Sequence, residues 1–392
     1  MDSAQQLEKS HHFQVYNRFP VTLSHGKGAK IWDVNGKQYL DLLAGIAVNN
    51  LGHSHPKIVE AIKVQAEKML HVSNFYYTEA QSQLVERLAN LSGLERVFLC
   101  NSGAEAMEAT VKLARKWGHE HGKTGNIISL AKGFHGRTVT TITMSAENYQ
   151  QGFAPLPTGF TKAPFNDFEA LAALVDNQTI AITFELIQGN SGVHVAEKEF
   201  VQKVRALCDE KNILLIIDEV QTGVARTGKF WCYEHYGITP DIVASAKALA
   251  GGIPIGAIMA KEEVAEVLSF GNHGTTFGGN PFACAVANAC LQTIAEENII
   301  EQAAEKGEYM MDLIREKTAR LETVVDVRGT GLMIGVELTI PGRPVVEKMF
   351  DLGVLSNAAG GNVLRIVPPL VITKKEIEQA VDVLVQSLAV SH

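Results

Sequence analysis

The chain has 392 residues, of which 46% are apolar and 20% are charged, as in an ordinary globular protein with a large buried core. A net charge of -8, without any block rich in lysine and arginine, argues against a nucleic-acid-binding protein. The five cysteines form no C-x-x-C pair, which argues against a disulfide framework or a zinc knuckle. The sequence has no signal-peptide core and no apolar run of the roughly 20 residues that span a bilayer, so we expect a cytoplasmic protein.

The first predicted element is a β-hairpin over residues 29–42, because apolar runs flank the strong turn signal Asn35-Gly36. Further along, short β-rich runs at 97–99, 127–130, 180–184, 214–217, 242–244 and 257–259 alternate with longer amphipathic patterns, including 104–117 and 198–211. This alternation predicts an α/β domain built around a mostly parallel sheet.

The C-terminal part has a different pattern. Two long helices are expected at 282–296 and 300–320, followed by short strands at 324–327, 332–338 and 363–366 and a last helix that starts at Lys374. We therefore expect a separate α+β unit after the α/β domain. Ligands of open α/β sheets bind beyond the carboxyl ends of the strands, so the residues at those ends are the first candidates for function.

Asp218 ends the apolar strand at 214–217. It could be a plain solvated strand end. It could also be the metal-holding acid of a P-loop ATPase, since Gly122-Lys123-Thr124 supplies part of a phosphate loop. That loop needs a glycine where this chain has Trp117, and a strand rather than a helix before it. A third possibility is that Asp218 pairs with the ring nitrogen of pyridoxal phosphate and favours its protonated, electron-withdrawing form.

A pyridoxal phosphate enzyme also needs a lysine, and Lys247 follows the strand at 242–244 among alanine, serine and glycine residues. A lone lysine is usually a solvated surface group, but small neighbours leave room for a bulky cofactor. Partial burial would lower the pKa of the amine and supply the neutral form that attacks an aldehyde. Ser102, Gly103 and Ala104 open a predicted helix, where they suit a phosphate or serve as a plain helix cap.

Together these segments resemble the class III aminotransferases of the ornithine and acetylornithine type, over nearly the whole chain. The matching segments are Asp218-Glu219-Val220-Gln221-Thr222-Gly223, Arg226-Thr227-Gly228, Pro240-Asp241, Ser245-Ala246-Lys247-Ala248, Gly52-His53-Ser54-His55-Pro56, Asn101-Ser102-Gly103-Ala104-Glu105-Ala106, Gly133-Phe134-His135-Gly136-Arg137 and Gly278-Gly279-Asn280-Pro281. The resemblance implies the type I fold of pyridoxal phosphate enzymes. Residues 51–281 would form the large α/β domain, and residues 1–50 and 282–392 would form a smaller α+β domain.

The resemblance also implies a role for each cofactor-binding residue. Lys247 would hold pyridoxal phosphate as a Schiff base and move the proton, and Asp218 would pair with the ring nitrogen. The other implied contacts are Gln221 at the ring hydroxyl, Phe134 and Val220 on the two ring faces, and Ser102, Gly103 and Ala104 at the phosphate. In this family a threonine of the partner subunit completes the phosphate site, and Thr276 matches it, so a homodimer with shared active sites is expected.

Two arginines match the family's carboxylate-binding positions. Arg137 would grip the substrate carboxylate, and Arg365 would receive the α-carboxylate of glutamate, although either could instead form a surface salt bridge. Such a pair suits a ping-pong enzyme whose amino acceptor is the dicarboxylate 2-oxoglutarate. Glu185 and Asn190 match further substrate-binding positions. His53 and His55 could be misread as metal ligands, but no third ligand pattern lies nearby and we predict no metal.

Ile46 favours the acetylornithine type, because ornithine-specific relatives carry a tyrosine at this position. We therefore expect transfer of the terminal amine of N-acetylornithine to 2-oxoglutarate, in arginine biosynthesis. Asn190 departs from the family, which usually has a glutamate that neutralises the arginine matching Arg365. A less masked Arg365 could favour N-succinylornithine, and ornithine and 4-aminobutyrate remain alternative donors. An aminomutase of the same family, or a catalytically silent fold, are alternatives of a different class.

Overall fold

The computed structural model describes residues 3–389. Its centre is a seven-stranded sheet in the order β4 (Arg96–Cys100), β12 (Gly256–Ala260), β11 (Ile242–Ser245), β10 (Leu214–Asp218), β7 (Thr179–Phe184), β5 (Asn126–Leu130) and β6 (Phe160–Ala163). Neighbouring strands run parallel except at β12, which is antiparallel to both β11 and β4. Residues 246–255 join β11 to β12, and they are too few for a parallel crossover, which needs about a dozen or more residues. The predicted α/β fold with a mostly parallel sheet is confirmed.

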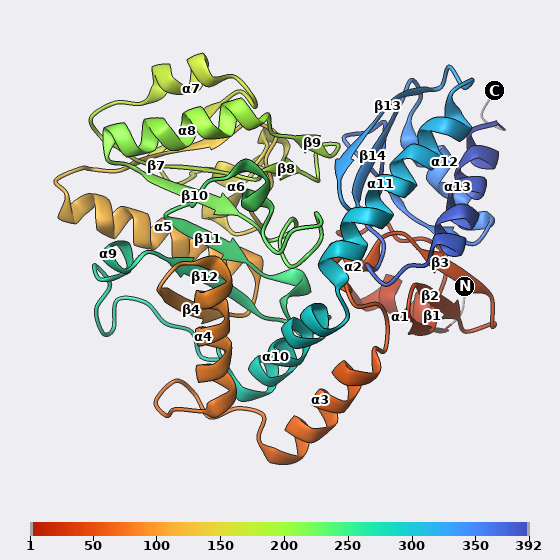
Figure 1. The fold of residues 1–392 in the computed structure, drawn as a ribbon, viewed down its shortest axis with the longest axis horizontal. Coiled ribbons are helices and arrows are strands. Elements are labelled where there is room, and N and C mark those ends of the chain that lie inside the picture. Colours follow the sequence, from red (N-terminus) through yellow and green to blue (C-terminus); the bar gives the residue numbers. More distant parts are fainter. Residues whose placement is uncertain (1–2, 390–392) are drawn as a thin grey trace.

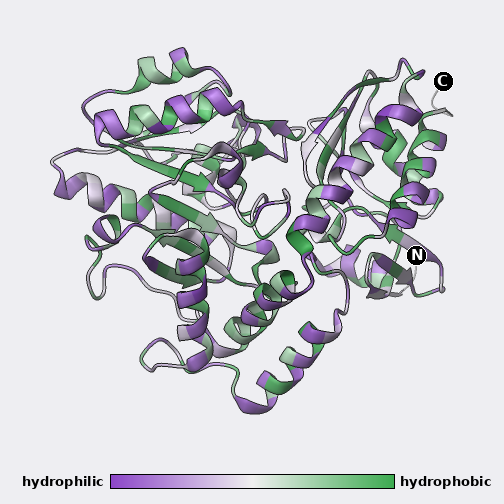
Figure 2. Ribbon diagram, viewed as in Figure 1, coloured by the Kyte–Doolittle hydropathy of each residue, from purple (hydrophilic) through white to green (hydrophobic). Residues whose placement is uncertain are grey.

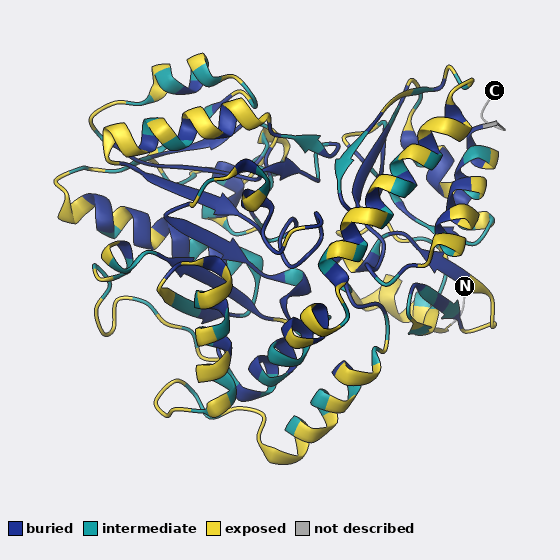
Figure 3. Ribbon diagram, in the orientation of Figure 1, coloured by how far each residue is buried: buried dark blue, intermediate teal, exposed yellow. Residues whose placement is uncertain are grey.

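Helices cover both faces of this sheet (Figure 1). Along β10, Leu214 and Ile216 join the apolar cluster of α5 (Gly103–Glu120), while Leu215 and Ile217 join the cluster that includes residues of α8 (Lys198–Lys211). Successive side chains of a strand point to opposite faces, so a continuous apolar run is needed when both faces are covered. The strands are apolar in Figure 2 and buried in Figure 3, whereas α8 and α7 (Phe168–Leu174) expose their outer faces.

A second lobe lies beside the first (Figure 1). It contains an antiparallel sheet in the order β13 (Val324–Thr330), β14 (Met333–Leu338), β17 (Val363–Ile366) and β16 (Asn357–Ala359). A further sheet holds β1 (Leu23–Lys27), β2 (Lys30–Asp33), β3 (Gln38–Asp41) and β15 (Val354–Leu355). The β2–β3 hairpin is as predicted, and β3 pairs in parallel with β15, so the two ends of the chain share one sheet. The exact domain boundaries stay a prediction.

The C-terminal part of the chain contains the long helices that the sequence predicts. Both long helices are confirmed, as α10 (Pro281–Glu296) and α11 (Ile299–Thr318), and the last helix is α13 (Lys374–Ala389). Helices α3 (Pro56–Lys68) and α4 (Glu79–Ser92) pack against α10, and α12 (Gly342–Asp351) packs against α13. Within residues 3–389, no helix combines the length and the apolar character needed to cross a membrane.

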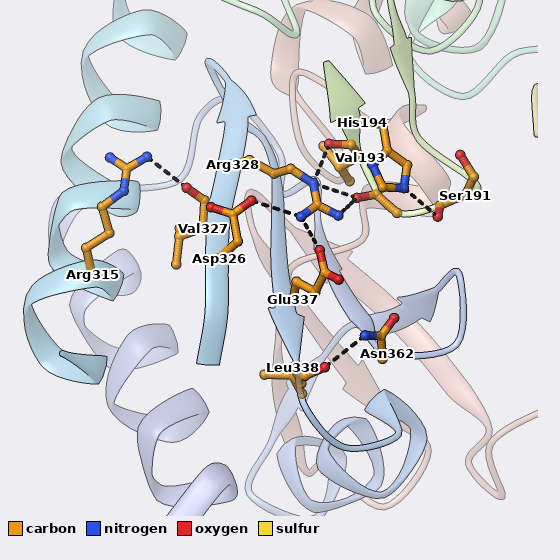
Figure 4. A network of polar contacts seen from close by, with 11 residues as sticks. Ser191, Val193, His194, Arg315, Asp326, Val327, Arg328, Glu337, Leu338 and Asn362 are labelled. Carbon is orange, nitrogen blue, oxygen red and sulfur yellow. Dashed lines mark hydrogen bonds and ion pairs between the residues drawn. The ribbon is translucent and has the colours of Figure 1, made fainter. Parts of the chain in front are cut away.

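Arg328 of β13 ties the two lobes together (Figure 4). Its guanidinium donates to the carbonyl oxygens of Gly192 (2.7 Å) and Val193 (3.1 Å) in the large lobe. The carboxylates of Asp326 (2.9 Å) and Glu337 (2.5 Å) hold the same guanidinium from the side of the small lobe. Because the charge is neutralised by two acids, the arginine can present its remaining donors to backbone oxygens. The loop that follows β8 (Ile187–Gln188) is thereby fixed against the second sheet.

Candidate active site

Four strand ends converge on one cavity of about 340 Å³. Asp218 ends β10, Glu185 follows β7, Lys247 follows β11, and Ser102 follows β4. These strands run in the same direction, so their carboxyl ends meet at one edge of the sheet, where ligands of α/β proteins bind. The lining residues are Val48, Asn101, Ser102, Gly103, Ala104, Phe134, His135, Gly136, Glu185, Asp218, Val220, Gln221, Ala246, Lys247, Gly252, Ile253, Pro254 and Ile255.

Lys247 is held in an uncommon backbone conformation, with φ of +46°. A non-glycine residue in this left-handed region is strained by about 1–2 kcal/mol, and such residues concentrate at functional sites. Burial lowers the pKa of its amine to about 8, against which the charge of Asp218 acts to raise it. At neutral pH about a tenth of the amine is therefore uncharged and able to act as a nucleophile or base.

Asp218 is 3% exposed and shares its two oxygens between two donors. Its Oδ2 lies 2.8 Å from Nδ1 of His135, and its Oδ1 accepts the N–H of Val220 at 3.0 Å. Burial alone would lower the pKa of His135, but the hydrogen bond and charge of Asp218 raise it. The histidine therefore fixes the position of the Asp218 carboxyl group at the end of β10. The sequence interpretation gave His135 no role, although it quoted the motif that contains it.

Glu185 lies beside this pair and accepts the N–H of Phe134 at 2.8 Å. Burial raises its pKa to about 7, while the charge of His135 lowers it and that of Asp218 raises it. A carboxyl group with this pKa changes protonation state near neutral pH, which is unusual for a glutamate and common at active sites. Lys247, Asp218, His135 and Glu185 thus form one buried group of interacting charges, which we call the cavity floor.

The N-terminus of α5 faces the same cavity. Ser102 is its N-cap, and the hydroxyl oxygen accepts the N–H of Glu105 at 3.2 Å. At Gly103 a Cβ atom would lie 2.8 Å from Cγ1 of Val220, so the cavity requires glycine there. The free N–H groups of the first helical turn and the helix dipole favour an anion at this position.

Arg365, on β17 of the second lobe, is buried beside the cavity. Among the described residues, its side-chain hydrogen-bond acceptors are all amide oxygens, namely those of Asn190 (2.6 Å), Asn357 (3.2 Å) and Gln221 (3.4 Å). Burial lowers its pKa to about 10, although the charge of Glu185 acts to raise it. A buried cation held only by neutral groups is a receptor for a carboxylate. Gln221 connects it to the cavity lining.

Comparisons with known proteins agree with this geometry. The family model described as aminotransferase class-III matches residues 13–388. The chain is 50% identical to the acetylornithine aminotransferase of Methanocaldococcus jannaschii over 384 residues, or 96% of each chain. The ornithine aminotransferase of Toxoplasma gondii, in which pyridoxal phosphate partly occupies the active site, has a TM-score of 0.95 and 36% identity, covering 98% of this chain and 93% of that one. The acetylornithine aminotransferase of Elizabethkingia anophelis has a TM-score of 0.88 and 35% identity, covering 98% of each chain.

The chain belongs to the class III aminotransferase family.

The pyridoxal phosphate predicted from the sequence fits the cavity of this aminotransferase. His135 is buried, and its Nε2 has no hydrogen-bond partner in the part of the chain that the structure describes. Lys247 and Asp218 line the same space, as an aldehyde and a ring nitrogen would require, and the start of α5 suits the phosphate. The cavity is also lined by six further predicted cofactor contacts, Ser102, Gly103, Ala104, Phe134, Val220 and Gln221, and by Glu185, which was predicted to contact the substrate.

Arg137 lies at the side of the cavity rather than in its lining. Its guanidinium sits 4.4 Å from the ring centroid of Tyr149 and 5.4 Å from that of Phe134. The two rings meet edge to face. Stacking of this kind fixes a guanidinium while leaving its in-plane N–H groups available for a carboxylate. The predicted substrate contact of Arg137 is therefore compatible with the structure and stays a prediction.

Two predicted site residues lie on the protein surface. Ile46 is 39% exposed, and Thr276 is exposed in the loop before α10. His53 and His55, which the sequence analysis weighed as metal ligands, instead contact Asp41 (2.7 Å) and Glu297 (3.4 Å). Within residues 3–389, no three acidic, histidine or cysteine side chains gather as a metal site would need.

Proposed function

We propose that this chain is a pyridoxal-phosphate-dependent aminotransferase that moves the terminal amino group of N-acetylornithine to 2-oxoglutarate. The products are N-acetylglutamate semialdehyde and glutamate. The observation that carries the proposal is Lys247, a lysine whose pKa is lowered to about 8, in one cavity with Asp218 and the N-terminus of α5. The donor is suggested by the relatives, since acetylornithine aminotransferases are 42–50% identical over nearly the whole chain.

When bound, pyridoxal phosphate supplies an electron sink for the negative charge that develops at the reacting carbon. Nζ of Lys247 takes the proton from that carbon and returns it at the neighbouring position. The carboxylate of Asp218 would hold a proton at the ring nitrogen, and His135 holds Asp218 in place at 2.8 Å. Phe134 and Val220 would hold the ring, Gln221 would hydrogen-bond its hydroxyl group, and the first turn of α5 would hold the phosphate.

The acceptor 2-oxoglutarate carries two carboxylates, and two arginines border the cavity. Arg137, stacked on Tyr149, would bind one carboxylate, and Arg365, held only by amide oxygens, would bind the other. An aminomutase moves an amino group within one molecule and needs no site for a second dicarboxylate. Arg365, whose hydrogen-bond partners among the described residues are all neutral amides, therefore favours transamination over the aminomutase.

The identity of the acyl group on the donor depends on the same arginine. Asn190 accepts a hydrogen bond from Arg365 at 2.6 Å but brings no negative charge to it. Arg365 is thus open to a second carboxylate while the donor is bound, as in N-succinylornithine. Ornithine and 4-aminobutyrate are the remaining alternatives, and Ile46 disfavours ornithine because it offers no polar partner to a free amino-acid end.

A single-turnover half-reaction tests this proposal. The purified enzyme is mixed without keto acid with N-acetylornithine, N-succinylornithine, ornithine or 4-aminobutyrate, and the visible absorbance of the bound cofactor is followed. Fast loss of the absorbance with N-acetylornithine and slow loss with the others is expected. A preference for another amine would change the donor and leave the cofactor site intact. No loss with any of them would contradict the assignment as a terminal-amine aminotransferase.

We further propose that the enzyme is a homodimer with shared active sites, acting in the cytoplasm in arginine biosynthesis. Two loops carry an exposed aromatic surface, made up of Phe75, Tyr76, Tyr77 and Phe277. Asn74 joins these loops by donating to the carbonyl oxygens of residues 275 and 278 at 3.2 Å and 2.9 Å. Exposed apolar patches of this kind mark interfaces. Thr276 lies in this surface, where it can reach a neighbouring subunit.

Mixing two inactive variants tests the shared site. If Thr276 serves the partner subunit, a hybrid dimer of Lys247→Ala and Thr276→Ala has one intact site, because lysine and threonine come from different chains. Mixing by denaturation and renaturation should then restore activity above that of either variant. If Thr276 serves its own chain, no hybrid has an intact site and activity is not restored. Sedimentation at several concentrations tests the dimer itself.

A further inference from the structure

Residues 44–47 form a turn of the wrong hand for L-amino acids. The φ angles of Ala44, Gly45, Ile46 and Ala47 are +48°, +67°, +66° and +58°. Glycine adopts such angles readily, but the other three residues do so only when their surroundings impose it. Four consecutive residues in the left-handed region indicate that something outside the turn holds it.

Asp41 is the group that holds the start of this turn. It is 2% exposed, and its Oδ1 accepts the N–H groups of Leu43 and Ala44, both at 2.8 Å. Its Oδ2 lies 2.7 Å from Nε2 of His53. The backbone of His53 is itself paired with that of Gly28, at 2.8 Å and 2.9 Å. The acid therefore connects the turn to the β1–β2 hairpin through a second residue.

The end of the turn is fixed by a different residue. Asn50 is buried, donates to the carbonyl oxygen of Val224 at 2.7 Å, and accepts a hydrogen bond from Arg226. Both of these partners belong to the large lobe, close to the strand that ends at Asp218. The turn is thus held on one side by the hydrogen bonds of Asp41 and on the other by those of Asn50.

The left-handed conformation decides which side chains face the cavity. Ala44 and Ala47 are buried, whereas Ile46 is exposed and Val48 lines the cavity. Asn49 lies against Gly252 of the cavity lining, where a Cβ atom would be 3.1 Å from its Oδ1. Val48 presents an apolar side chain to the cavity, and Ile46, two residues before it, is the predicted donor contact. Apolar side chains at the mouth of the cavity suit a neutral acyl group and penalise a charged ammonium that would lose water there.

We propose that Asp41 is a positioning residue for donor specificity: with His53, it holds the left-handed turn of residues 44–47 and thereby sets the preference for acylated over free ornithine-type donors. It does so without touching the donor. This inference rests on the proposed function, because it concerns the donor side of the same cavity.

The test is a double-variant cycle on donor preference. The ratio of kcat/KM for N-acetylornithine to that for ornithine is measured for wild type, Asp41→Ala, Ile46→Ala and the double variant. Asp41→Ala should lower the ratio roughly tenfold, the size expected for one lost apolar contact, mainly through KM. The double variant should show the same ratio as Ile46→Ala alone, because Asp41 acts through the turn.

Asp33→Ala is the matched control. Asp33 also holds a turn, the one between β2 and β3, by accepting the N–H groups of Asn35 and Lys37 at 2.9 Å each, but it lies outside the cavity lining. It should lower stability and leave the donor ratio unchanged. Asp41→Asn keeps an oxygen acceptor for the two N–H groups and should keep most of the ratio.

A second measurement does not depend on catalysis. In the cofactor-free protein, hydrogen exchange of the backbone amides of residues 43–49 should speed up in Asp41→Ala and not in Asp33→Ala. If Asp41→Ala fails to fold, His53→Ala removes only the Oδ2 contact and should shift both readouts in the same direction by less. Faster exchange with an unchanged donor ratio, or additive effects in the double variant, would overturn the proposal. If the wild type prefers another amine, the proposed substrate is wrong, and the same cycle run on the preferred pair still tests Asp41.

Discussion

The cavity floor and the cavity rim of this aminotransferase are built in different ways. Lys247, Asp218, His135 and Glu185 of the floor sit at or near strand ends of one sheet, where His135 lies 2.8 Å from Asp218 and Glu185 accepts the N–H of the neighbouring Phe134 at 2.8 Å. The rim is assembled from the turn at 44–47, from Asn190 and from Arg365, which belong to segments far apart in the sequence. We therefore expect the sheet to determine the chemistry and separate segments of the two lobes to determine which donor is accepted.

The electrostatics of the two regions differ as well. In the floor, acids and bases face one another, and burial moves the pKa of Glu185 to about 7 and that of Lys247 to about 8. Both groups change protonation state near neutral pH, as proton transfer requires. In the rim, the guanidinium of Arg365 donates to amide oxygens, and burial lowers its pKa to about 10. The floor has groups that can exchange protons near neutral pH, and the rim has an arginine that can bind a carboxylate.

The largest effect is expected in the floor, from Lys247→Ala. Loss of the amine removes both the attachment of the cofactor and the proton carrier, so the single-turnover rate should fall at least about 1,000-fold. Exposed Lys229 lies outside the cavity lining, and Lys229→Ala is the control that should keep wild-type activity. A Lys247→Ala enzyme that still turned over the donor at a tenth of the normal rate would contradict the assignment.

The second prediction concerns His135→Phe, which removes the 2.8 Å contact to Asp218 and keeps an aromatic ring in place. Without this partner Asp218 is a weaker counter-charge for the ring nitrogen, so kcat/KM should fall roughly ten- to a hundredfold, as for outer partners of metal ligands. The affinity for pyridoxal phosphate, measured by equilibrium dialysis, should weaken too. His25→Phe, at an exposed histidine, is the control. Unchanged cofactor affinity would show that His135 does not support Asp218.

Most of the floor could be predicted from the sequence, because its residues belong to short motifs that directly follow strands. The strand at 214–217 and the lysine after 242–244 were both in the predicted places, and the sheet geometry brings them together. His135 was missed as a functional residue, since its partner Asp218 lies 83 positions away and no local pattern joins them. The antiparallel direction of β12 was not predicted either. It follows from the short connection between β11 and β12, which the secondary-structure propensities of single residues do not describe.

For the rim, the sequence predicted individual residues but not how they are arranged in space. Nothing local in the sequence shows that Ala44, Ile46 and Ala47 adopt positive φ, because these residue types rarely do so. Asn190 and Arg365 were named as matches to family positions, but their 2.6 Å contact depends on the packing of two lobes through Arg328. Long-range contacts of this kind are set by tertiary structure rather than by periodicity.

In the rim, Asn190→Glu should shift donor preference without disabling the chemistry. The new carboxylate would neutralise Arg365, so N-succinylornithine should lose roughly tenfold in kcat/KM relative to N-acetylornithine, about the value of one charge-assisted hydrogen bond. The half-reaction with 2-oxoglutarate should stay largely intact, because the glutamate usual in the family is expected to neutralise the arginine only while the amino donor is bound. Asn190→Gln keeps the amide and is the control. An unchanged donor preference in Asn190→Glu would show that Arg365 does not take part in recognition of the amino donor.

The smallest effect is expected on the free energy of unfolding. The prediction compares Glu185 of the floor with Glu219, a buried acid outside the cavity lining. Burial raises the pKa of Glu185 from its ordinary 4.5 to about 7, so the folded protein binds more protons than the unfolded one between these pH values. The free energy of unfolding should therefore fall as the pH rises through that window, by about 1–3 kcal/mol for this group. Glu185→Gln should remove this part of the fall in cofactor-free protein, measured by urea unfolding at pH 5 and pH 7.5. Glu219, whose pKa burial also raises to about 7, should behave likewise in Glu219→Gln. Saturating pyridoxal phosphate should, however, change the pH dependence more in Glu219→Gln, which keeps Glu185, than in Glu185→Gln. An equal response of both variants to the cofactor would mean that Glu185 does not sense the occupied cavity.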